Sequence, residues 1–291
     1  MNITATLTQA GGRLETSGVA EARREAASLL AHALGRDRTF LFAHPEYELS
    51  DDENELYVSL ITRRCGREPY QYIVGKREFY GLDFEVTPDV LIPRPETEIL
   101  VEHAIDLLKT VERPDFLEIG VGSGCISISV LKNIPASIAV GVDVSDNALA
   151  VAGRNAQING VADRLKLLRS DIYSSLRDET FDAILSNPPY IPAADLATLQ
   201  PEVRDYEPGS ALTDGGDGLG IIREIIRGAP SRLRPGGVLI IEFGFGQSES
   251  VISMFSGKLW SSTSVVDDMQ GIPRTAIATL GGAGSEASFS G

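Results

Sequence analysis

The stretch LEIGVGSGCISISVL, residues 117–131, decides the fold. It begins with a short apolar run typical of a buried strand, continues through three alternating glycines, Gly120, Gly122 and Gly124, and enters a second apolar segment. Glycine at a strand-to-helix turn lets the backbone adopt positive φ and approach a ligand closely. The spacing G-x-G-x-G differs from the dinucleotide-binding pattern G-x-G-x-x-G, so these residues alone also fit a simple tight turn.

Predicted strands and helices alternate around this stretch. Five apolar runs stand at intervals long enough for crossover helices, namely DFLEIG (115–120), IAVGVDV (138–144), LKLLRSD (165–171), FDAILSN (181–187) and GVLIIEF (237–243). This alternation predicts an α/β fold with a parallel sheet and helices on both of its faces. The last two runs, STSVVDD (262–268) and RTAIATL (274–280), are separated only by MQGIP, which is too short for a parallel crossover, so we expect them to pair antiparallel.

The first seventy or so residues predict helices instead of strands. In VAEARREAASLLAHALG, residues 19–35, apolar side chains recur at helical spacing, and Gly35 is a suitable stop. Ser50 and Glu53 have the S-x-x-E spacing of a capping box, which marks the start of another helix. Residues 71–93 are rich in β-branched and aromatic residues with glycines between them, and predict a hairpin or an extended linker.

Composition and charge narrow the class of protein. The chain has 291 residues, of which 43% are hydrophobic and 23% charged, as is typical of a globular protein with two domains. The sequence shows neither a membrane span nor a signal peptide, so we expect a cytoplasmic protein. The net charge of −15 argues against nucleic acid as the main partner. Cys65 and Cys125 are expected to be reduced thiols, and the three histidines lack metal-ligand spacing, so we expect no metal.

Acidic residues follow the second and third predicted strands. Asp143 lies 23 residues after Gly120, the distance at which a carboxylate accepts hydrogen bonds from ribose hydroxyls, although it also fits a simple cap. Ser145 is expected to cap the next helix. Asp171 can accept a hydrogen bond from an exocyclic amine, and Ile172 can pack on a purine face. Because the carboxyl ends of parallel strands meet at one edge of a sheet, we expect a nucleoside site there.

The stretch SNPPY, residues 186–190, ends the fourth predicted strand at the same edge. Prolines cannot donate to a β-ladder, so a strand-ending turn accounts for both of them. It does not account for an amide and an aromatic ring, Asn187 and Tyr190, beside a nucleoside site. We therefore interpret this turn as a binding element as well as a strand end.

Together, EIGVGSG (118–124), the acidic end of the second strand and NPPY (187–190) resemble a class I S-adenosylmethionine-dependent methyltransferase that acts on a planar nitrogen. Three further stretches are similar to the release factor glutamine methyltransferase family, PrmC/HemK; they are EPYQYIVGKREFYGLDFEV (68–86), LIPRPETEIL (91–100) and YEPGSALTDGGDGLGIIREII (206–226). NPPY is shared with adenine-N6 methyltransferases, whereas PRPETE combined with NPPY is more specific. Glu118 stands where that family often has Asp, and Val121 where Thr is frequent.

The resemblance implies a fold and a division of the chain. The fold is the class I methyltransferase (Rossmann-like) seven-stranded sheet, mostly parallel with an antiparallel last strand, plus a small N-terminal helical domain. The implied parts are a substrate-docking helical domain (1–72), a β-hairpin linker (73–93), a catalytic domain that binds S-adenosylmethionine (94–280) and a disordered tail (281–291).

The resemblance also implies a reaction: N5-methylation of the glutamine side chain in the Gly-Gly-Gln loop of peptide-chain release factors, with S-adenosyl-L-methionine converted to S-adenosyl-L-homocysteine. The implied catalytic residues are Asn187, Pro188 and Tyr190, which bind substrate together with Pro189. The implied cofactor-binding residues are Glu118, Gly120, Val121, Gly122, Ser123, Gly124, Asp143, Asp171, Ile172 and Asn187. No membrane and no direct nucleic-acid substrate are expected.

Several alternatives stay open. The substrate could be a ribosomal-protein glutamine or the N6 amine of adenine in DNA or RNA, or the chain could be a binding protein with a decayed methyltransferase core. Arg94, Glu96 and Glu98 fit either a helix start or the wall of the site, and Phe79 and Tyr80 either cover the pocket or pack the hairpin. Residues 191–215 form a long connection and are a candidate substrate cover.

Overall fold

The computed structural model describes residues 1–255 and 257–282 and divides the chain into two compact units. The helical unit consists of residues 1–76 and 200–206, and the sheet unit of residues 77–199 and the chain from 207 onward. Residues 200–206 thus belong to the helical unit although they lie far along the chain. Residues 283–291 of the predicted disordered tail lie outside the described residues, and the finer predicted boundaries stay predictions.

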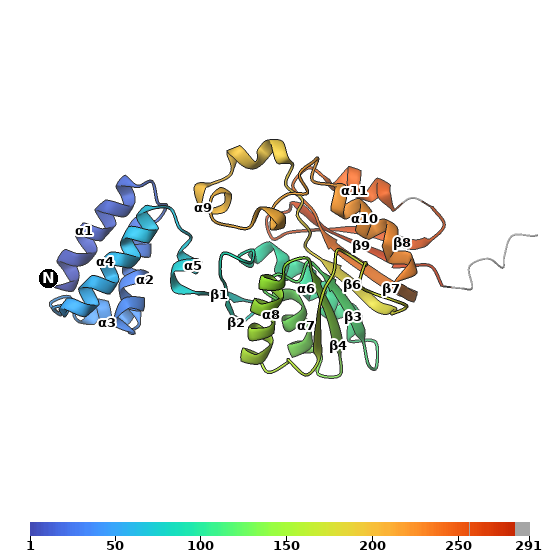
Figure 1. Cartoon of the computed structure of the whole chain (residues 1–291), viewed down its shortest axis with the longest axis horizontal. Coiled ribbons are helices and arrows are strands. Elements are labelled where there is room, and N and C mark those ends of the chain that lie inside the picture. The colour runs from blue at the N-terminus through green and yellow to red at the C-terminus, as the bar shows by residue number, and fades with distance from the viewer. Residues whose placement is uncertain (256, 283–291) are drawn as a thin grey trace, which may run out of the picture. The chain divides into compact units, whose positions relative to one another are not determined.

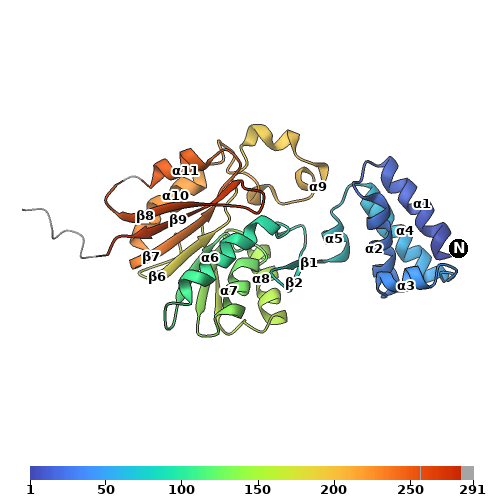
Figure 2. The same cartoon turned by 180° about the vertical axis from the view of Figure 1, so that it is seen from behind.

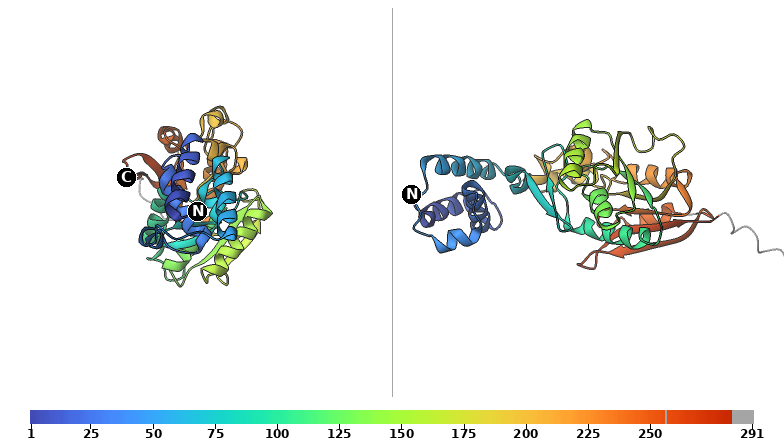
Figure 3. Two further views of the ribbon diagram at one scale, coloured as in Figure 1. Left: turned by 90° about the vertical axis from the view of Figure 1, so that its left-hand side faces the viewer. Right: turned by 90° about the horizontal axis from the view of Figure 1, so that it is seen from below.

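The helical unit confirms the predicted N-terminal helices, which Figure 3 shows from two directions. They are α1 (Ile3–Thr16), α2 (Ala22–Leu34), α3 (Arg38–Ala43), α4 (Asp51–Cys65) and α5 (Tyr70–Val74), and α9 (Pro201–Arg204) joins them from the later segment. Their core contains Leu14, Leu29 and Leu30, all fully buried. Tyr57 from α4 is also buried, and its hydroxyl donates to the Ala26 carbonyl at 3.1 Å, so its polar end is satisfied inside the core.

Capping residues fix where these helices begin and end. The Ser50 hydroxyl accepts from the Glu53 backbone N–H at 3.3 Å, and the Glu53 carboxylate accepts from the Ser50 N–H at 2.8 Å, which confirms the capping box. Gly35 ends α2 with φ 59°, a left-handed conformation that glycine adopts without a steric cost.

Ion pairs hold residues 200–206 in the helical unit. The Glu202 carboxylate pairs with Arg64 at 3.0 Å and with Arg67 at 2.6 Å. Arg64 is only 4% exposed and also pairs with Glu25, so its buried charge has two carboxylate partners. The Tyr206 hydroxyl donates to the Gly66 carbonyl. The connection 191–215, expected as one substrate cover, is therefore divided, with its middle residues fixed by charge to α4.

The sheet unit contains the predicted seven-stranded sheet. Its strands are β3 (Asp115–Ile119), β4 (Ile138–Asp143), β5 (Leu165–Arg169), β6 (Phe181–Ser186), β7 (Leu233–Glu242), β8 (Trp260–Asp267) and β9 (Pro273–Leu280). They lie in the order β5-β4-β3-β6-β7-β9-β8. The pairs from β5 to β7 are parallel, and β9 is antiparallel to both β7 and β8. The predicted fold class and the antiparallel pairing of the last two strands are confirmed.

Helices cover both faces of this sheet (Figures 1 and 2). They are α6 (Glu98–Leu108), α7 (Cys125–Asn133), α8 (Asp146–Ile158), α10 (Gly220–Gly228) and α11 (Ser248–Met254). One apolar core joins α6 and α7 to the sheet and contains the fully buried Phe116. A second core joins α10 and α11 to the opposite face and contains the fully buried Phe243. The strands are therefore buried on both sides, as near-continuous apolar runs such as FDAILSN predict.

A short hairpin precedes the first large helix. It consists of β1 (Lys76–Phe79) and β2 (Leu82–Glu85), and Tyr80 and Gly81 in its turn both have positive φ, 51° and 73°. Positive φ at both central residues is the geometry of a type I′ hairpin turn. The reading of residues 71–93 as hairpin or extended chain is wrong at its start, because α5 takes up residues 70–74. The pattern of aromatic and β-branched residues there reflects burial of Tyr72 and Ile73 on one helical turn.

The hairpin also decides between the two readings of its aromatic residues. Phe79 is 1% exposed and packs edge-on against Phe84 at 6.1 Å between ring centroids, so it belongs to the core. The Glu98 carboxylate accepts from the Tyr80 N–H at 3.0 Å and ties the hairpin turn to the start of α6. The described residues also include the 3₁₀ turns η1 (Pro95–Thr97), η2 (Ala193–Thr198), η3 (Gly209–Ala211) and η4 (Ala229–Ser231). Within the described residues, no helix has the length and hydropathy to cross a bilayer.

The capping box of α4 gives a first prediction. Replacing Ser50 by alanine leaves the Glu53 N–H without its side-chain acceptor, and we expect the free energy of unfolding of the helical unit to fall by about 1 kcal/mol. Urea unfolding followed by circular dichroism measures this. Ser59→Ala is the matched control, because Ser59 lies within the same helix and only donates to the Leu56 carbonyl. Equal losses in both variants would contradict the role of the cap.

Candidate active site

The strand order reverses beside β3, and this reversal creates the site. The chain runs from β3 outward through β4 to β5 and then returns to the other side of β3 with β6. Ile119 and Ser186, the last residues of β3 and β6, are direct partners, and the Ser186 hydroxyl donates to the Ile119 carbonyl at 2.8 Å. Connections that leave two neighbouring strands in opposite directions open a crevice at their carboxyl ends. Gly120 and Asn187 come next on these two strands and therefore face one crevice.

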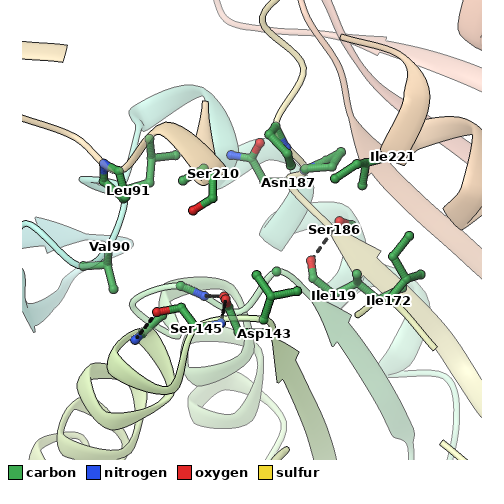
Figure 4. Close-up of a pocket in the computed structure, with 18 of the residues that line it drawn as sticks. Val90, Leu91, Ile119, Asp143, Ser145, Ile172, Ser186, Asn187, Ser210 and Ile221 are labelled. Atoms are coloured by element: carbon green, nitrogen blue, oxygen red, sulfur yellow. Dashed lines mark hydrogen bonds between the residues drawn. The ribbon is translucent and has the colours of Figure 1, made fainter. Parts of the chain in front are cut away.

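A cavity occupies this crevice (Figure 4). It is lined by Asp89, Val90, Leu91, Ile119, Gly120, Gly122, Asp143, Val144, Ser145, Ala148, Ser170, Asp171, Ile172, Ser186, Asn187, Pro188, Pro189, Pro208, Ser210, Ala211 and Ile221. Figure 4 shows Asp143 and Ser145 on one side of the cavity, with Asn187 and Ser210 across from them. The structure thus brings the glycine turn, both predicted aspartates and the NPP turn together in one place.

The glycine turn after β3 depends on its lack of side chains. Gly120, Gly122 and Gly124 all have positive φ, at 73°, 52° and 81°. A Cβ on Gly124 would lie 2.9 Å from Ile128 Cδ1 and 3.3 Å from Ala152 Cβ at a positive φ, so a side chain at the start of α7 would be strained. Gly120 and Gly122 line the cavity, whereas Gly124 packs below it.

Asp143 is held by the turn that it faces. Its Oδ2 accepts from the Gly122 N–H at 3.0 Å, and its Oδ1 accepts from the Ser145 N–H at 3.0 Å. The Ser145 hydroxyl in turn accepts from the Ala148 N–H at 3.2 Å, which confirms Ser145 as the N-cap of α8. Each carboxylate oxygen of Asp143 retains a further lone pair toward the cavity. The side chain is therefore fixed and can still accept hydrogen bonds from a ligand.

The loop after β5 presents Asp171 and Ile172 to the cavity. Asp171 is exposed, and its N–H donates to the Ser174 hydroxyl at 3.0 Å. Ile172 has φ 47°, a left-handed conformation that is unfavourable for a β-branched residue. Such strain persists only where the surrounding structure enforces it, and it is concentrated at ligand sites. Here it places an apolar side chain on the cavity wall.

Three other residues that the resemblance assigned to cofactor binding, Glu118, Val121 and Ser123, lie outside the lining of the cavity. Glu118 is 1% exposed, and its Oε2 accepts from both the N–H and the hydroxyl of Ser127 at the start of α7. Burial raises the pKa of Glu118 to about 8, against the effect of these hydrogen bonds. Val121 and Ser123 are also buried. Through Ser127, Glu118 holds the first turn of α7, the helix that follows the glycine turn.

The NPPY turn divides its residues between the cavity and the protein interior. Asn187, Pro188 and Pro189 line the cavity, and Asn187 Nδ2 donates to the Thr97 hydroxyl at 3.0 Å. No group of the described residues donates to Asn187 Oδ1, so this oxygen is left to accept a hydrogen bond from a ligand. Thr97 is the threonine of PRPETE and is 2% exposed. This stretch therefore orients the amide of the NPPY turn.

Tyr190 does not line the cavity. Its hydroxyl donates to Glu242 Oε1 at 3.1 Å, and its carbonyl accepts from Gln247 Nε2 at 2.9 Å. Burial raises the pKa of Tyr190, so the phenol stays protonated. Glu242 ends β7 and Gln247 follows it, which makes β7 and the loop after it the anchor of this turn. Tyr190 thereby holds Asn187 and Pro188 in position from behind.

Two segments form the outer wall of the site. Residues 89–91, after the hairpin, were not placed there by sequence reasoning, whereas Pro208, Ser210 and Ala211 belong to the connection 191–215, which was expected as a candidate substrate cover. Glu207 fastens them together, because its carboxylate pairs with Arg94 at 2.6 Å and accepts from the Ile92 N–H at 3.3 Å. Burial raises the pKa of Glu207, and Arg94 counteracts this rise. The sequence feature that pointed to these parts of the chain was the similarity of LIPRPETEIL and YEPGSALTDGG to one family. This similarity did not indicate where they lie in the structure.

Two family models match the chain. The PrmC N-terminal domain matches residues 5–75, and the methyltransferase small domain matches residues 95–200. The release factor glutamine methyltransferase of Geobacter sulfurreducens is 46% identical over 93% of this chain and 94% of its own length. The protein of the same name in Cereibacter sphaeroides is 43% identical over 92% and 95%. The chain belongs to the release factor glutamine methyltransferase family.

Solved structures agree on the fold of the sheet unit. A methyltransferase from Pyrococcus furiosus has a TM-score of 0.51 with 20% identity, over 70% of this chain and 91% of its own. A 16S rRNA methyltransferase from T. thermophilus has a TM-score of 0.52 with 19% identity, over 70% of this chain and 49% of its own. At this level of identity the likeness concerns the fold, which is the class I methyltransferase fold. As a member of its family, the protein is a methyltransferase.

Gly218 lies close to the backbone of the NPPY turn, where a side chain would not fit. A Cβ on Gly218 would lie 2.1 Å from the Tyr190 carbonyl oxygen, whereas a Cβ on Gly215 would meet nothing within 4 Å. Both glycines have nearly the same positive φ, 77° and 78°. Gly218→Ala should therefore lower the free energy of unfolding by about 1–3 kcal/mol more than Gly215→Ala. Thermal unfolding measures this, and an equal effect of both substitutions would show that Tyr190 does not constrain residue 218.

Glu118 should make the stability depend on pH. The folded state raises its pKa from 4.5 to about 8, so between these values the folded protein holds a proton that the unfolded chain has lost. The stabilising contribution of this proton is present below pH 4.5 and is lost as pH rises toward 8. Glu118→Gln should therefore reduce the decrease in free energy of unfolding between pH 5 and pH 8. Glu112→Gln, at an exposed position, is the control, and an unchanged decrease in the Glu118 variant would contradict the burial argument.

Proposed function

We propose that this protein methylates the side-chain nitrogen N5 of the glutamine in the Gly-Gly-Gln loop of peptide-chain release factors, with S-adenosyl-L-methionine as methyl donor. The proposal is supported by the names of the curated relatives and by one observation in the site. Asn187 lines the cavity and its Nδ2 donates to Thr97, so the amide oxygen is the group of this side chain that is left to accept a hydrogen bond from a ligand. An acceptor at this place suits a substrate that brings an NH2 group.

The other end of the cavity fits the nucleoside part of the donor. Gly120 and Gly122 leave room for close approach to the backbone, and the Asp143 carboxylate is fixed as an acceptor for ribose hydroxyls. Asp171 can accept from an exocyclic amine, and Ile172 offers an apolar surface to a purine. When bound, S-adenosylmethionine supplies a methyl group activated by its sulfonium. The protein's own residues have to bind, align and exclude water.

Alignment is the main task of the NPPY turn. An amide nitrogen is a poor nucleophile because its lone pair is delocalised, so its position relative to the methyl group matters more than a base. Asn187 Oδ1 and the Pro188 carbonyl can accept from the two N–H groups of the substrate amide. As the nitrogen gains positive charge in the transition state, both hydrogen bonds become stronger, and this difference accelerates the reaction. Two consecutive prolines stiffen the backbone that carries these acceptors. The charged nitrogen then loses its proton to water.

Removing the Asn187 acceptor tests this role. Asn187→Ala should lower kcat by about 10²–10³-fold, the effect of deleting one hydrogen-bonding group from a charge-stabilising site. Donor affinity, measured by calorimetry, should stay nearly the same because the amide acts on the substrate nitrogen. Asn133→Ala, at an exposed position on α7, is the matched control for the loss of an asparagine. A large loss of donor affinity in Asn187→Ala would mean that this residue mainly binds the donor.

The substrate is tested with labelled S-adenosylmethionine and purified release factors. Label should appear on a release factor that carries the Gly-Gly-Gln glutamine and be absent when this glutamine is replaced by alanine. Purified ribosomal protein, DNA and RNA are offered in parallel. Transfer to any of these, or to the glutamine-free release factor, would overturn the proposed substrate while leaving the methyltransferase family in place.

A further inference from the structure

We propose that Glu242 and Thr97 are positioning residues. They determine whether the oxygen or the NH2 group of the Asn187 side-chain amide points into the cavity. The inference rests on the proposed function, in which that oxygen accepts from the substrate amide. Neither residue lines the cavity, and they come from different parts of the sheet unit, η1 and the end of β7. The amide of an asparagine is nearly symmetric in shape, so its orientation is decided by hydrogen-bond partners and not by packing.

A chain of hydrogen-bonding groups connects these residues. Asn187 Nδ2 donates to Thr97 Oγ1 at 3.0 Å, which leaves the proton of the threonine hydroxyl to be donated to another group. Thr97 lies near enough to the Glu242 carboxylate to lower its pKa by hydrogen bonding. Tyr190 occupies the other oxygen, Oε1, at 3.1 Å. The geometry therefore runs from Asn187 through Thr97 to Glu242 and on to Tyr190 of the same NPPY turn.

One buried atom, Glu242 Oε2, indicates how these hydrogen-bonding groups pair. Glu242 is 1% exposed, and its Oε2 has no hydrogen bond of normal geometry from any described residue. A buried polar atom without a partner is costly, and here an unused hydroxyl proton and an unused carboxylate oxygen belong to neighbouring side chains. Pairing them satisfies both. A threonine that donates to Glu242 can only accept from Asn187, so Asn187 must turn its NH2 toward Thr97 and its oxygen toward the cavity.

Protonation of Glu242 would reverse this order. A protonated carboxyl can donate from Oε2 to Thr97 Oγ1, and the threonine hydroxyl would then donate to Asn187. If the amide turned its oxygen inward to accept this proton, its NH2 would point toward the cavity, where it would oppose the NH2 of the substrate. The ionised form of Glu242 therefore favours the productive orientation.

The surroundings of Glu242 bring its protonation into the neutral pH range. Burial raises the pKa of Glu242 to about 7, while the hydroxyls of Thr97 and Tyr190 and the charge of Arg274 on β9 lower it and the charge of Glu96 raises it further. The charge of Glu242 also acts on Cys125 of α7; burial raises the pKa of the Cys125 thiol to about 12, so the thiol stays neutral. Arg274 is the cation that lowers the pKa of Glu242.

Nuclear magnetic resonance tests the inference without substrate or donor. In the full chain with ¹⁵N-labelled asparagine, the side-chain NH2 signals of Asn187 are identified by their loss in Asn187→Ala. We expect these signals to shift with pH around a midpoint near 7. The pH-dependent shift should disappear in Glu242→Gln, because residue 242 can no longer titrate. It should also disappear in Thr97→Val, which keeps the shape of the side chain but removes the hydroxyl. Thr97→Ser restores the hydroxyl and should restore the shift, and Glu249→Gln, at an exposed position, should leave it unchanged.

Methyl transfer supplies the second arm. The kcat of the wild-type protein should fall as pH drops below the same midpoint, and Glu242→Gln should give a kcat lower by about 10-fold or more that no longer follows this pH dependence. The affinity for S-adenosylmethionine should remain unchanged in Glu242→Gln and Thr97→Val, which a general loss of structure would not allow. The combined variant should be no worse than the more severe single variant, because both act through one chain.

The two arms separate the failure of this inference from that of the proposed function. A wild-type protein that transfers no methyl group to release factors would defeat the proposed function, while the Asn187 signals still decide the inference. If these signals do not titrate, or titrate equally in Glu242→Gln and Thr97→Val, the inference is overturned. Additive losses of kcat in the combined variant would also overturn it, because they would show that the two residues act independently.

Discussion

The parallel pairing of β3 with β6 is the constraint on which the site depends. It sets Ile119 beside Ser186, so the two residues that follow, Gly120 and Asn187, must leave the sheet at neighbouring points. One of these exits is a glycine turn that can lie against a ligand, and the other is a proline-stiffened turn that carries acceptors. Every other part of the cavity is placed relative to this pair, because β4, β5 and β7 are added outward from it.

The sequence allowed the fold and the inner half of the cavity to be predicted, because both follow from local patterns. Apolar runs separated by crossover lengths determine a parallel sheet, and the carboxyl ends of such strands converge, so Gly120, Asp143, Asp171 and Asn187 could be expected to meet. Capping at Ser50 and Ser145 is also local, since a side chain there bonds to a backbone group three residues away. The error at residues 70–74 has the same origin, because a single helical turn is too short to show its period.

The outer half of the site could not be predicted from residue patterns, because its contacts join distant parts of the chain. Glu207 binds Arg94 across 113 positions, and Asn187 binds Thr97 across 90. Nothing near Tyr190 in the sequence indicates that its hydroxyl will meet a carboxylate at the end of β7. Likewise, nothing near Glu118 in the sequence indicates that it will be buried and bound to Ser127, and its assignment to cofactor binding by resemblance stays a prediction.

Glu118, Glu207 and Glu242, which are buried in the described part of the sheet unit, share the same physical explanation. Burying a carboxylate is unfavourable, and the raised pKa of each one expresses this cost. An apolar residue in the same place would give greater stability, but it would not orient its neighbours. A carboxylate does orient them, because it accepts hydrogen bonds only in defined directions. Each glutamate lies directly behind a different wall of the cavity: the glycine turn, the outer segments and the NPPY turn. Polar groups therefore fix the walls of the cavity, where orientation matters most, and the sheet unit relies on its two apolar cores for stability elsewhere.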